Sequence, residues 1–222
     1  MPESTNQLAV VTGDVIASTE FAERTALPHI LQEAFEGLTR RIGQPIRGFE
    51  IYRGDSFQGL VEPEWALLAA TILRARLRAV RLAGSPRGGA LDARIAIGIG
   101  SAEHQAARVV ESDGEAYRFS GRALDEMARA KETSRLRVEG RSVPAQVHIT
   151  VQLLDAIISA WSVAAAESAF LALTETDRTQ ADMAKRQGVS QPAVSQRLQA
   201  ARFDNVQELL ELYARALTIA RE

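Results

Sequence analysis

The sequence predicts an α+β fold, in which a mainly antiparallel sheet carries helices on one face and is followed by a small all-α domain. Two observations predict it. Up to residue 132 the patterns follow the order strand, helix, hairpin, helix, strand, helix. From about residue 150 onward only helical periodicity remains. We therefore expect two domains, at residues 1–145 and 146–222.

The first elements are a strand, a helix and a hairpin. Leu8–Thr12 is a continuous apolar run that a Gly-Asp pair stops, which is typical of a buried strand. Apolar residues then recur at three- and four-residue spacing from about 25 to 42, as in an amphipathic helix. Two short β-type runs within 48–62 lie on either side of Gly54, and this pattern predicts a hairpin.

A helix, a strand and a further helix complete the first domain. The second helix is predicted at 65–82, where its four arginines are expected to form a solvated face. A loop rich in Gly and Pro leads to a strand at Ala93–Ile99, and a third helix is predicted at about 120–131. This order is that of a ferredoxin-like sheet with helices packed against one face.

Composition excludes several classes of protein. The 222 residues include 26 Lys and Arg, 28 Asp and Glu and no Cys, with a formal net charge of -2. Disulfide frameworks and thiolate metal sites are therefore excluded. No apolar run reaches the roughly 18 residues that would span a bilayer, and no secretory leader precedes the first strand. We expect a cytoplasmic protein with no membrane partner.

The segment from Gln180 to Ala201 predicts two helices around a tight turn. Gly188 can adopt the positive φ of such a turn, the Ser190 hydroxyl can cap the second helix, and Pro192 is tolerated in a first helical turn. These signals fall at the spacing of a helix-turn-helix, and the segment resembles bacterial helix-turn-helix regulators over about 25 residues. The shared core is expected to contain Met183, Val189, Val194 and Leu198.

The outer face of the second helix is suited to DNA. Its side chains form hydrogen bonds without carrying negative charge, as base recognition in a major groove requires. Between Arg178 and Arg202 five basic residues stand against one acidic residue. Arg197 and Arg202 are candidates for phosphate contacts. The full set of predicted DNA-binding residues is Ser190, Gln191, Ser195, Gln196, Arg197, Gln199 and Arg202. The alternative is an ordinary helical hairpin with a solvated polar face.

Two aspartates are candidates for a ligand site in the first domain. Asp14 ends the first strand, and Asp55 lies at the hairpin tip. If that strand lies beside the hairpin, both carboxylates reach one edge of the sheet. Like charges that close require a cation or a raised pKa, and Mg²⁺ accepts one or two carboxylates together with phosphate oxygens. For each aspartate alone, formation of a turn is the alternative role.

Four motifs in this domain resemble those of a known fold. GDVIAST, RGDSFQG, ARIAIGIG and SGRALDEMARAKE occur in the order and approximate spacing of the class III nucleotidyl cyclase catalytic domain, a palm-type fold. GDVIAST, RGDSFQ and DGEAYRFSGRALDEM, followed by a helical tail, resemble the SatD family more closely. The cyclase resemblance implies that Asp14, Asp55 and the Val15 carbonyl bind Mg²⁺ or Mn²⁺. It also places Arg129 where cyclases keep a transition-state arginine.

The same resemblance implies a nucleotide ligand and a homodimer. The residues after Asp14, with the hairpin arginine, are predicted to bind nucleotide phosphates: Ile16, Ala17, Ser18, Thr19 and Arg53. Two positions depart from the cyclase pattern, because Asp125 replaces the catalytic asparagine and Ile51 replaces the base-selecting lysine. An added negative charge beside a triphosphate is unfavourable. Asp125 and Arg129 are the predicted catalytic positions, and cyclase turnover is not expected.

These observations favour a DNA-binding transcription regulator. Helix-turn-helix proteins bind half-sites as dimers, and a palm-like domain that pairs two chains would set the half-site spacing. The expected partners are therefore double-stranded DNA, a second copy of the chain and a nucleotide. Two alternatives stay open: a metal-dependent nucleotidyl enzyme with a DNA-targeting module, and a protein-interaction module that does not bind DNA.

Overall fold

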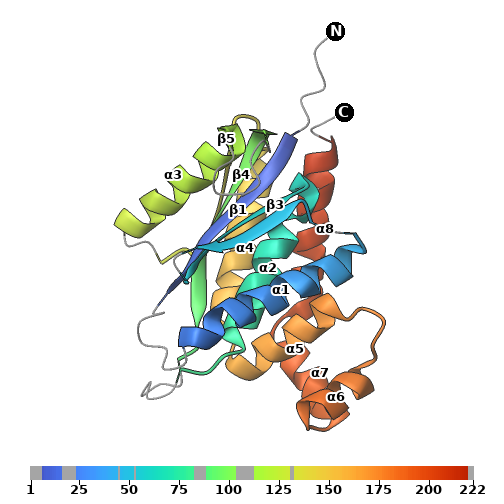
Figure 1. Ribbon diagram of the computed structural model, residues 1–222. Helices are drawn as coiled ribbons and strands as arrows, with labels where there is room; N and C mark the ends of the chain where they lie inside the picture. The colour runs from blue at the N-terminus through green and yellow to red at the C-terminus, as the bar shows by residue number, and fades with distance from the viewer. Residues whose placement is uncertain are drawn as a thin grey trace.

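The computed structural model describes residues 7–16, 24–44, 46–52, 54–82, 89–103, 113–130 and 133–219. Its centre is one sheet (Figure 1), in which the long strand β1 (Gln7–Ile16) lies between β3 (Ser56–Val61) and β4 (Asp92–Glu103). β2 (Gly48–Tyr52) pairs with β3, and the two-residue β5 (Asp113–Gly114) pairs with the end of β4. All of these pairs are antiparallel.

The connections show a ferredoxin-like core. Between β1 and β2 lies α1 (Leu27–Ile42), preceded by the 3-10 turn η1 (Arg24–Ala26). Between β3 and β4 lies α2 (Ala66–Arg78), preceded by η2 (Pro63–Trp65). The strand order β2-β3-β1-β4 with these two crossovers is the βαββαβ arrangement of that fold. The predicted α+β sheet is confirmed, including the hairpin, whose Gly54 has a φ of 79°.

One helix departs from the predicted one-sided layer. α3 (Glu115–Arg129) lies on the face of the sheet opposite to α1 and α2 (Figure 1). That face is also apolar, because Leu8, Val10 and Leu60 form a buried cluster with Ala116 of α3. Gly98 allows the close approach, since a Cβ there would stand 2.1 Å from the Ala116 carbonyl oxygen. The prediction that helices cover one face was wrong, because it overlooked this second apolar side.

The sequence also gave no prediction of β6 (Leu136–Gly140), which pairs parallel to β4. It is followed by five helices: α4 (Ala145–Ser159), α5 (Val163–Thr174), α6 (Gln180–Gln187), α7 (Gln191–Ala200) and α8 (Phe203–Ile219). No strand is assigned in the described residues after β6, in agreement with the helical periodicity of this part of the sequence.

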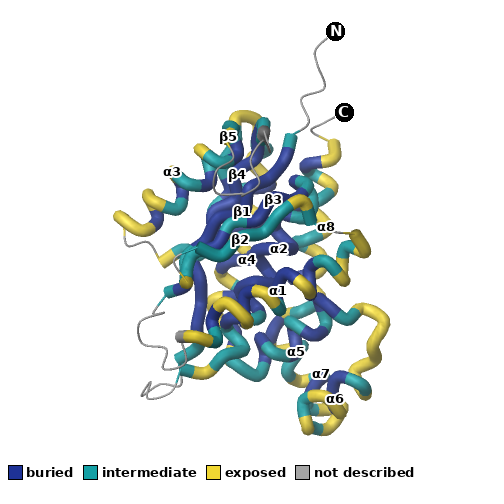
Figure 2. The backbone as a smooth tube through the Cα atoms, viewed as in Figure 1, coloured by how far each residue is buried: buried dark blue, intermediate teal, exposed yellow. Residues whose placement is uncertain are grey.

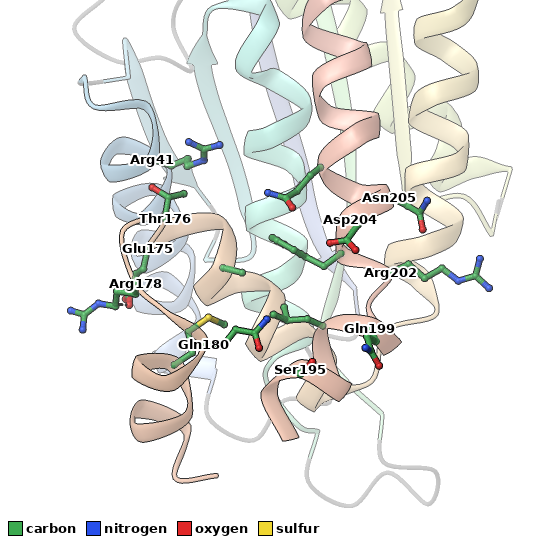
Figure 3. A pocket seen from close by; sticks show the side chains of 15 residues that line it. Arg41, Glu175, Thr176, Arg178, Gln180, Ser195, Gln199, Arg202, Asp204 and Asn205 are labelled. Atoms are coloured by element: carbon green, nitrogen blue, oxygen red, sulfur yellow. Dashed lines mark ion pairs between the residues drawn. The ribbon is translucent and has the colours of Figure 1, made fainter. Parts of the chain in front are cut away.

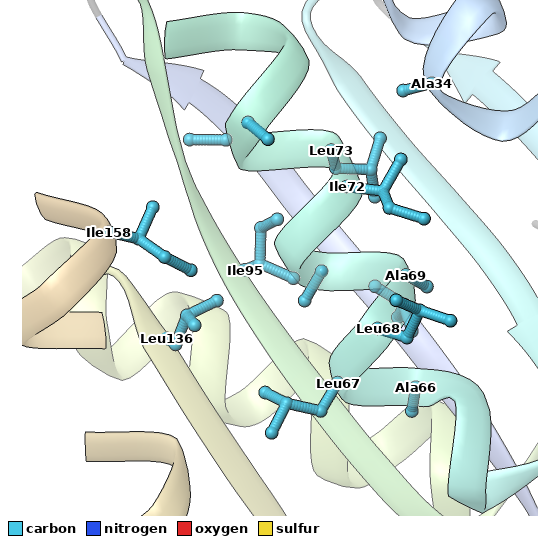
Figure 4. Close-up of a cluster of buried hydrophobic side chains, with 14 of the residues drawn as sticks. Ala34, Ala66, Leu67, Leu68, Ala69, Ile72, Leu73, Ile95, Leu136 and Ile158 are labelled. Carbon is cyan, nitrogen blue, oxygen red and sulfur yellow. The ribbon is translucent and has the colours of Figure 1, made fainter. Parts of the chain in front are cut away.

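α2 is the centre of the main core. Eleven of its 13 residues are buried, as expected of a helix with other elements on all sides. The sheet covers one side of α2, and α4 and α5 pack against it from the C-terminal part of the chain. Figure 4 shows this junction, where Ile95 and Leu136 from the sheet and Ile158 from α4 surround the α2 side chains. The main core is therefore continuous across the predicted boundary at residue 145.

α6 and α7 lie apart from this core, at one end of the molecule (Figure 1). A separate small cluster holds them to α5 and contains Leu171, Met183, Ala184 and Val194. Figure 2 shows much of the backbone around α6 and α7 as exposed, in contrast to the buried centre of the sheet. Across the described residues, no helix combines the length and the apolar character that a bilayer crossing requires.

Candidate functional site

The two predicted aspartates meet at one edge of the sheet. Asp14 is paired in register with Ser56 of β3 on one side and with Arg94 of β4 on the other. Asp55 precedes Ser56 in the β2–β3 turn, and its carbonyl oxygen accepts a hydrogen bond from the Val15 N–H at 2.9 Å. The predicted proximity of these two residues therefore follows directly from the strand pairing.

Arg94 holds the Asp14 carboxylate with both arms of its guanidinium. Nε donates to Oδ1 at 3.1 Å and Nη2 donates to Oδ2 at 2.5 Å. Such a fork-to-fork pair is the strongest geometry that arginine and a carboxylate form. Both side chains are partly shielded, with 23% of Arg94 and 28% of Asp14 exposed. Arg94 was not among the predicted site residues, although it lies within the ARIAIGIG motif.

This edge does not fit a divalent cation as it stands. Mg²⁺ and Mn²⁺ require carboxylate oxygens that are free to coordinate, and both Asp14 oxygens accept from Arg94. Within the described ranges, no three His, Cys, Asp or Glu side chains cluster closely enough to hold a metal. Val15, the predicted carbonyl ligand, has its side chain in the main core.

The predicted nucleotide-binding residues fall mostly outside the described part of the chain. Ile16 is the last residue of β1 and is half-buried. Ala17, Ser18, Thr19 and Arg53 lie outside the described residues.

The predicted catalytic pair lies on the outer face of α3. This helix contacts the sheet through Ala116, Ser120 and Met127, and the Ser120 hydroxyl accepts a hydrogen bond from Thr12 at 3.0 Å. Asp125 and Arg129 occupy the opposite face, where they form an exposed ion pair with each other at 3.5 Å. The structure therefore does not bring Asp125 and Arg129 to Asp14 within one chain.

The α6–α7 hairpin has the predicted local structure. Thr179 and Asp182 form a reciprocal capping box at the start of α6, and the hydrogen bonds from Thr179 lower the pKa of the Asp182 carboxyl. Gly188 adopts a φ of 64° in the turn, and the Ser190 hydroxyl accepts from the Ala193 N–H. The capping box therefore defines the start of α6, and Gly188 and Ser190 define the turn between α6 and α7.

The predicted DNA-binding residues separate into two groups. Ser190, Gln191, Gln196, Gln199 and Arg202 are exposed, and Ser195 is half-buried beside them. Gln191 is held by a 2.9 Å hydrogen bond to the Gln180 side-chain oxygen. Arg197 differs, because its Nη1 donates to Gln187 at 2.5 Å and lies 3.5 Å from Glu167. Arg197 thus ties α7 to α6 and α5.

A groove of about 830 Å³ runs beside the hairpin. Figure 3 shows its walls, which come from the end of α1, the end of α5 and the loop after it, α6, α7 and the start of α8. Ser195 and Gln199 line it from α7, and three arginines that are exposed stand around it: Arg41, Arg178 and Arg202. Sequence reasoning missed Arg41, because it belongs to α1 and lies far from the hairpin in the chain.

Comparison with known proteins decides the family. The model of the SatD family matches residues 8–207, which include both the sheet and the α6–α7 hairpin. The chain belongs to the SatD family. No curated protein matches it.

Two solved structures resemble this SatD-family chain in part. The active GGEEF domain of a diguanylate cyclase from Vibrio cholerae has 16% identity and a TM-score of 0.41, over 62% of this chain and 85% of that one. A bacterial light-regulated adenylyl cyclase has 16% identity and a TM-score of 0.36, over 59% of this chain and 42% of that one. The fold assignment rests on the strand order and register described above.

A buried charge network in the SatD-family chain was not predicted. Arg74 of α2 has no exposed side-chain surface, and it donates to both oxygens of Asp92 at 2.8 Å. It also donates to Asp155 of α4 at 2.6 Å and to the Ser159 hydroxyl at 2.9 Å. The prediction that the α2 arginines form a solvated face was therefore wrong for Arg74.

Two further groups complete this network. Arg78 donates to Asp92 at 2.8 Å and to the carbonyl oxygen of Trp161 at 2.6 Å. The second oxygen of Asp155 accepts from the Ser134 hydroxyl and the Arg135 N–H, each at 2.8 Å. Since every charged partner is paired, the network serves to fix α4 against α2 and β4.

Burial and charge act in opposite directions on Asp92. Burial alone would raise the pKa of its carboxyl, but the hydrogen bonds and charge of Arg74, with the charge of Arg78, outweigh it and lower the pKa. Likewise burial opposes ionisation of Arg74, and the hydrogen bonds and charges of its two aspartates raise its pKa instead. Both groups are therefore charged at neutral pH.

Proposed function

We propose that this SatD-family chain is a DNA-binding transcription regulator, in which α7 enters the major groove of double-stranded DNA. The observation that carries the proposal is the outer face of α7. It holds Gln191, Gln196 and Gln199, all exposed, and no acidic side chain. Glutamine can form paired hydrogen bonds with adenine in the major groove. An α-helix with its side chains is about 10–12 Å across, which suits a major groove about 12 Å wide.

The arginines beside α7 support contacts with phosphates. Arg178, Arg202 and Arg41 are exposed around the groove that α7 lines. Phosphate contacts fix the position of a protein on DNA and do not discriminate sequence. In this proposal Arg41 extends the DNA surface onto the sheet domain, and Arg197 positions α7 through its contacts with Gln187 and Glu167.

The backbone of Arg202 gives independent support. Arg202 has a φ of 51° between α7 and α8, a conformation that glycine adopts without cost and that arginine adopts at a cost of about 1 kcal/mol. Strained residues of this kind cluster at functional sites. The role that we infer is a phosphate contact at the end of α7.

Pairing of two chains is the second part of the proposal. The large apolar side chains that are exposed on the described residues all belong to α4 and α8: Ile149, Leu153, Leu212 and Ile219. These helices pack against each other, and the Trp161 indole N–H donates to the Ala201 carbonyl oxygen where α4 ends and α8 begins. An exposed apolar patch of this kind marks an interaction surface.

A second copy of the chain is the partner that fits this patch. Exposed Glu211 and Arg215 lie one helical turn apart on α8. If two α8 helices pair antiparallel about a two-fold axis, each Glu211 faces Arg215 of the partner subunit. A dimer would place two α7 helices on half-sites about one helical turn apart.

The sheet domain contributes a nucleotide site to the proposal, on the basis of the motif resemblance. The alternative, a metal-dependent nucleotidyl enzyme, is less favoured because Arg94 occupies both oxygens of Asp14.

The test is selection of genomic DNA fragments by the full chain, followed by binding measurements at several salt concentrations. We expect salt-dependent affinity for a two-half-site sequence. Gln196→Ala should weaken specific binding by about 1–3 kcal/mol, and Arg202→Ala should reduce the salt slope by about one phosphate contact. Gln32→Ala is the matched control, since this glutamine is exposed on α1 and belongs neither to the α6–α7 hairpin nor to the proposed dimer surface. Absence of any salt-dependent DNA binding would overturn the proposal.

A further inference from the structure

The edge of the sheet where Asp14 and Asp55 meet contains its own cation. Along β4, successive side chains point to opposite faces of the sheet. This alternation determines which β4 side chain lies on the same face as Asp14. Ile95 and Ile97 are buried in the main core, so the intervening residues face the other side of the sheet. There Arg94 is opposite Asp14, and the following positions of that face are Ala96 and Gly98. Arg94 is thus the long side chain that β4 brings to this carboxylate.

The register that brings Arg94 to Asp14 is strongly specified. β1 and β4 pair over ten consecutive residue pairs, from Gln7 opposite Ser101 to Ile16 opposite Asp92. A slip by one residue would move the buried residues of both strands to the opposite face, and both faces here are packed. The backbone positions of Arg94 and Asp14 are therefore opposite each other whenever the sheet is formed.

A divalent cation would have to displace this guanidinium. Mg²⁺ needs carboxylate oxygens at about 2.0–2.1 Å in nearly ideal octahedral geometry. Both Asp14 oxygens accept hydrogen bonds from Arg94, and a fixed positive charge next to the carboxylate repels a second cation. Because Arg94 belongs to the same sheet as Asp14, the guanidinium is present at this carboxylate at any protein concentration, and a metal ion from solution must compete with it.

We propose that Arg94 takes the place of a divalent metal at this edge and excludes Mg²⁺ and Mn²⁺ from the Asp14 carboxylate. The charge of the Asp14 carboxylate is then neutralised by the protein itself, through Arg94. This property belongs to the sheet domain and does not depend on the DNA-binding role proposed for α7. In this proposal Arg94 supplies a covalently attached cation at the carboxylate for which the sequence predicted a metal ion.

The experiment is a titration of the full chain with Mn²⁺, in which free Mn²⁺ is followed by electron paramagnetic resonance. Five proteins are compared: wild type, Asp14→Asn, Arg94→Met, Arg94→Lys and Arg94→Met with Asp14→Asn. Wild type is expected to show no saturable site that depends on Asp14. Arg94→Met should gain one Mn²⁺ site, bound at least about tenfold more tightly than by wild type, and the added Asp14→Asn should abolish it.

Arg94→Lys separates charge from bulk. Lysine retains the positive charge but lacks the planar guanidinium that pairs with both carboxylate oxygens. Arg94→Lys should therefore bind Mn²⁺ no better than wild type. Circular dichroism confirms that each variant is folded; if Arg94→Met does not fold, Arg94→Gln replaces it. The proposal is overturned if wild type binds one Mn²⁺ that Asp14→Asn removes, or if the folded variant without a charge at position 94 gains no site.

Discussion

Two residues of β4 only two positions apart, Asp92 and Arg94, form arginine–aspartate pairs with the same bidentate chemistry in different surroundings. Asp92 is paired with Arg74, whose side chain has no exposed surface. Arg94 is paired with Asp14 at the end of the sheet, where about a quarter of each side chain is exposed. The hydrogen-bond distances are similar, from 2.5 to 3.1 Å. Geometry at the contact therefore does not distinguish the two pairs.

Surroundings give the two pairs different roles. Arg74 is joined by Asp155, Ser159 and Arg78, and these partners belong to helices on both sides of the predicted domain boundary. Removing one charge there leaves others buried, whereas water can reach either partner of the Arg94–Asp14 pair. We infer that the first pair holds the fold together and that the second controls what the sheet edge can bind.

The largest expected effect is the loss of Arg74. Arg74→Met removes the positive charge and leaves Asp92 and Asp155 buried, with Arg78 as the remaining cation. Breaking such a network typically costs about 3–5 kcal/mol, a large part of the about 5–15 kcal/mol that stabilises a domain. Chemical denaturation followed by circular dichroism measures the free energy of unfolding.

Arg81→Met provides the control for this prediction. Arg81 follows α2 and is exposed, so its replacement should change the free energy of unfolding by less than about 0.5 kcal/mol. If Arg74→Met cost no more than Arg81→Met, the network would not be what fixes α4 against the sheet.

The next effect is a loss of stability in acid. Because the pKa of Asp92 is lower in the folded protein than its ordinary value of 3.8, the unfolded chain binds the proton more readily. The stabilisation from Asp92 is complete above that ordinary value and is lost as the pH falls through the lower folded pKa. The free energy of unfolding should therefore decline below about pH 4.

Asp92→Asn is expected to flatten this decline, although it also lowers stability at neutral pH. Denaturation curves at pH 3, 4 and 7 measure both effects, and the side-chain carbonyl shift of Asp92 in the wild type gives its pKa directly by NMR. The stabilising role of Asp92 would be contradicted if the free energy of unfolding of Asp92→Asn declined in acid as steeply as that of the wild type. A pKa of Asp92 above 3.8 in the folded protein would contradict it too.

Local signals made much of the fold predictable. Strands β1 to β4, the hairpin at Gly54 and the α6–α7 turn each depend on residues within a few positions of one another, such as Gly188 and the capping Ser190. The sheet edge was predictable for the same reason, because strand order follows from the βαββαβ pattern and places Asp14 beside Asp55. Local signals did not predict which face α3 covers.

The charged partners were not predictable from spacing. Arg74, with its neighbours at 76, 78 and 81, has the spacing of a solvated face, and the carboxylates that neutralise it lie 18 and 81 residues away. Arg94 lies 80 residues from Asp14. No sequence period encodes a contact between elements that only the tertiary fold brings together. The pair of aspartates was therefore predictable from the sequence, and the arginine that pairs with Asp14 was not.

The smallest expected effect sharpens the comparison between the two pairs. Arg94→Met breaks a bidentate pair as completely as Arg74→Met does, but Asp14 lies at the end of a strand and can be hydrated when its partner is lost. Partly exposed ion pairs contribute about 0–1 kcal/mol, so we expect a loss within that range by the same denaturation measurement. Asp14→Asn should cost a similar amount, since it removes the same interaction from the other side.

A loss of 3 kcal/mol or more, of the order given for a buried pair, would show that the Arg94–Asp14 pair also stabilises the fold. The difference in exposure would then not explain the two roles. A small loss together with gain of a Mn²⁺ site would separate stability from ligand selection at neighbouring positions of one strand.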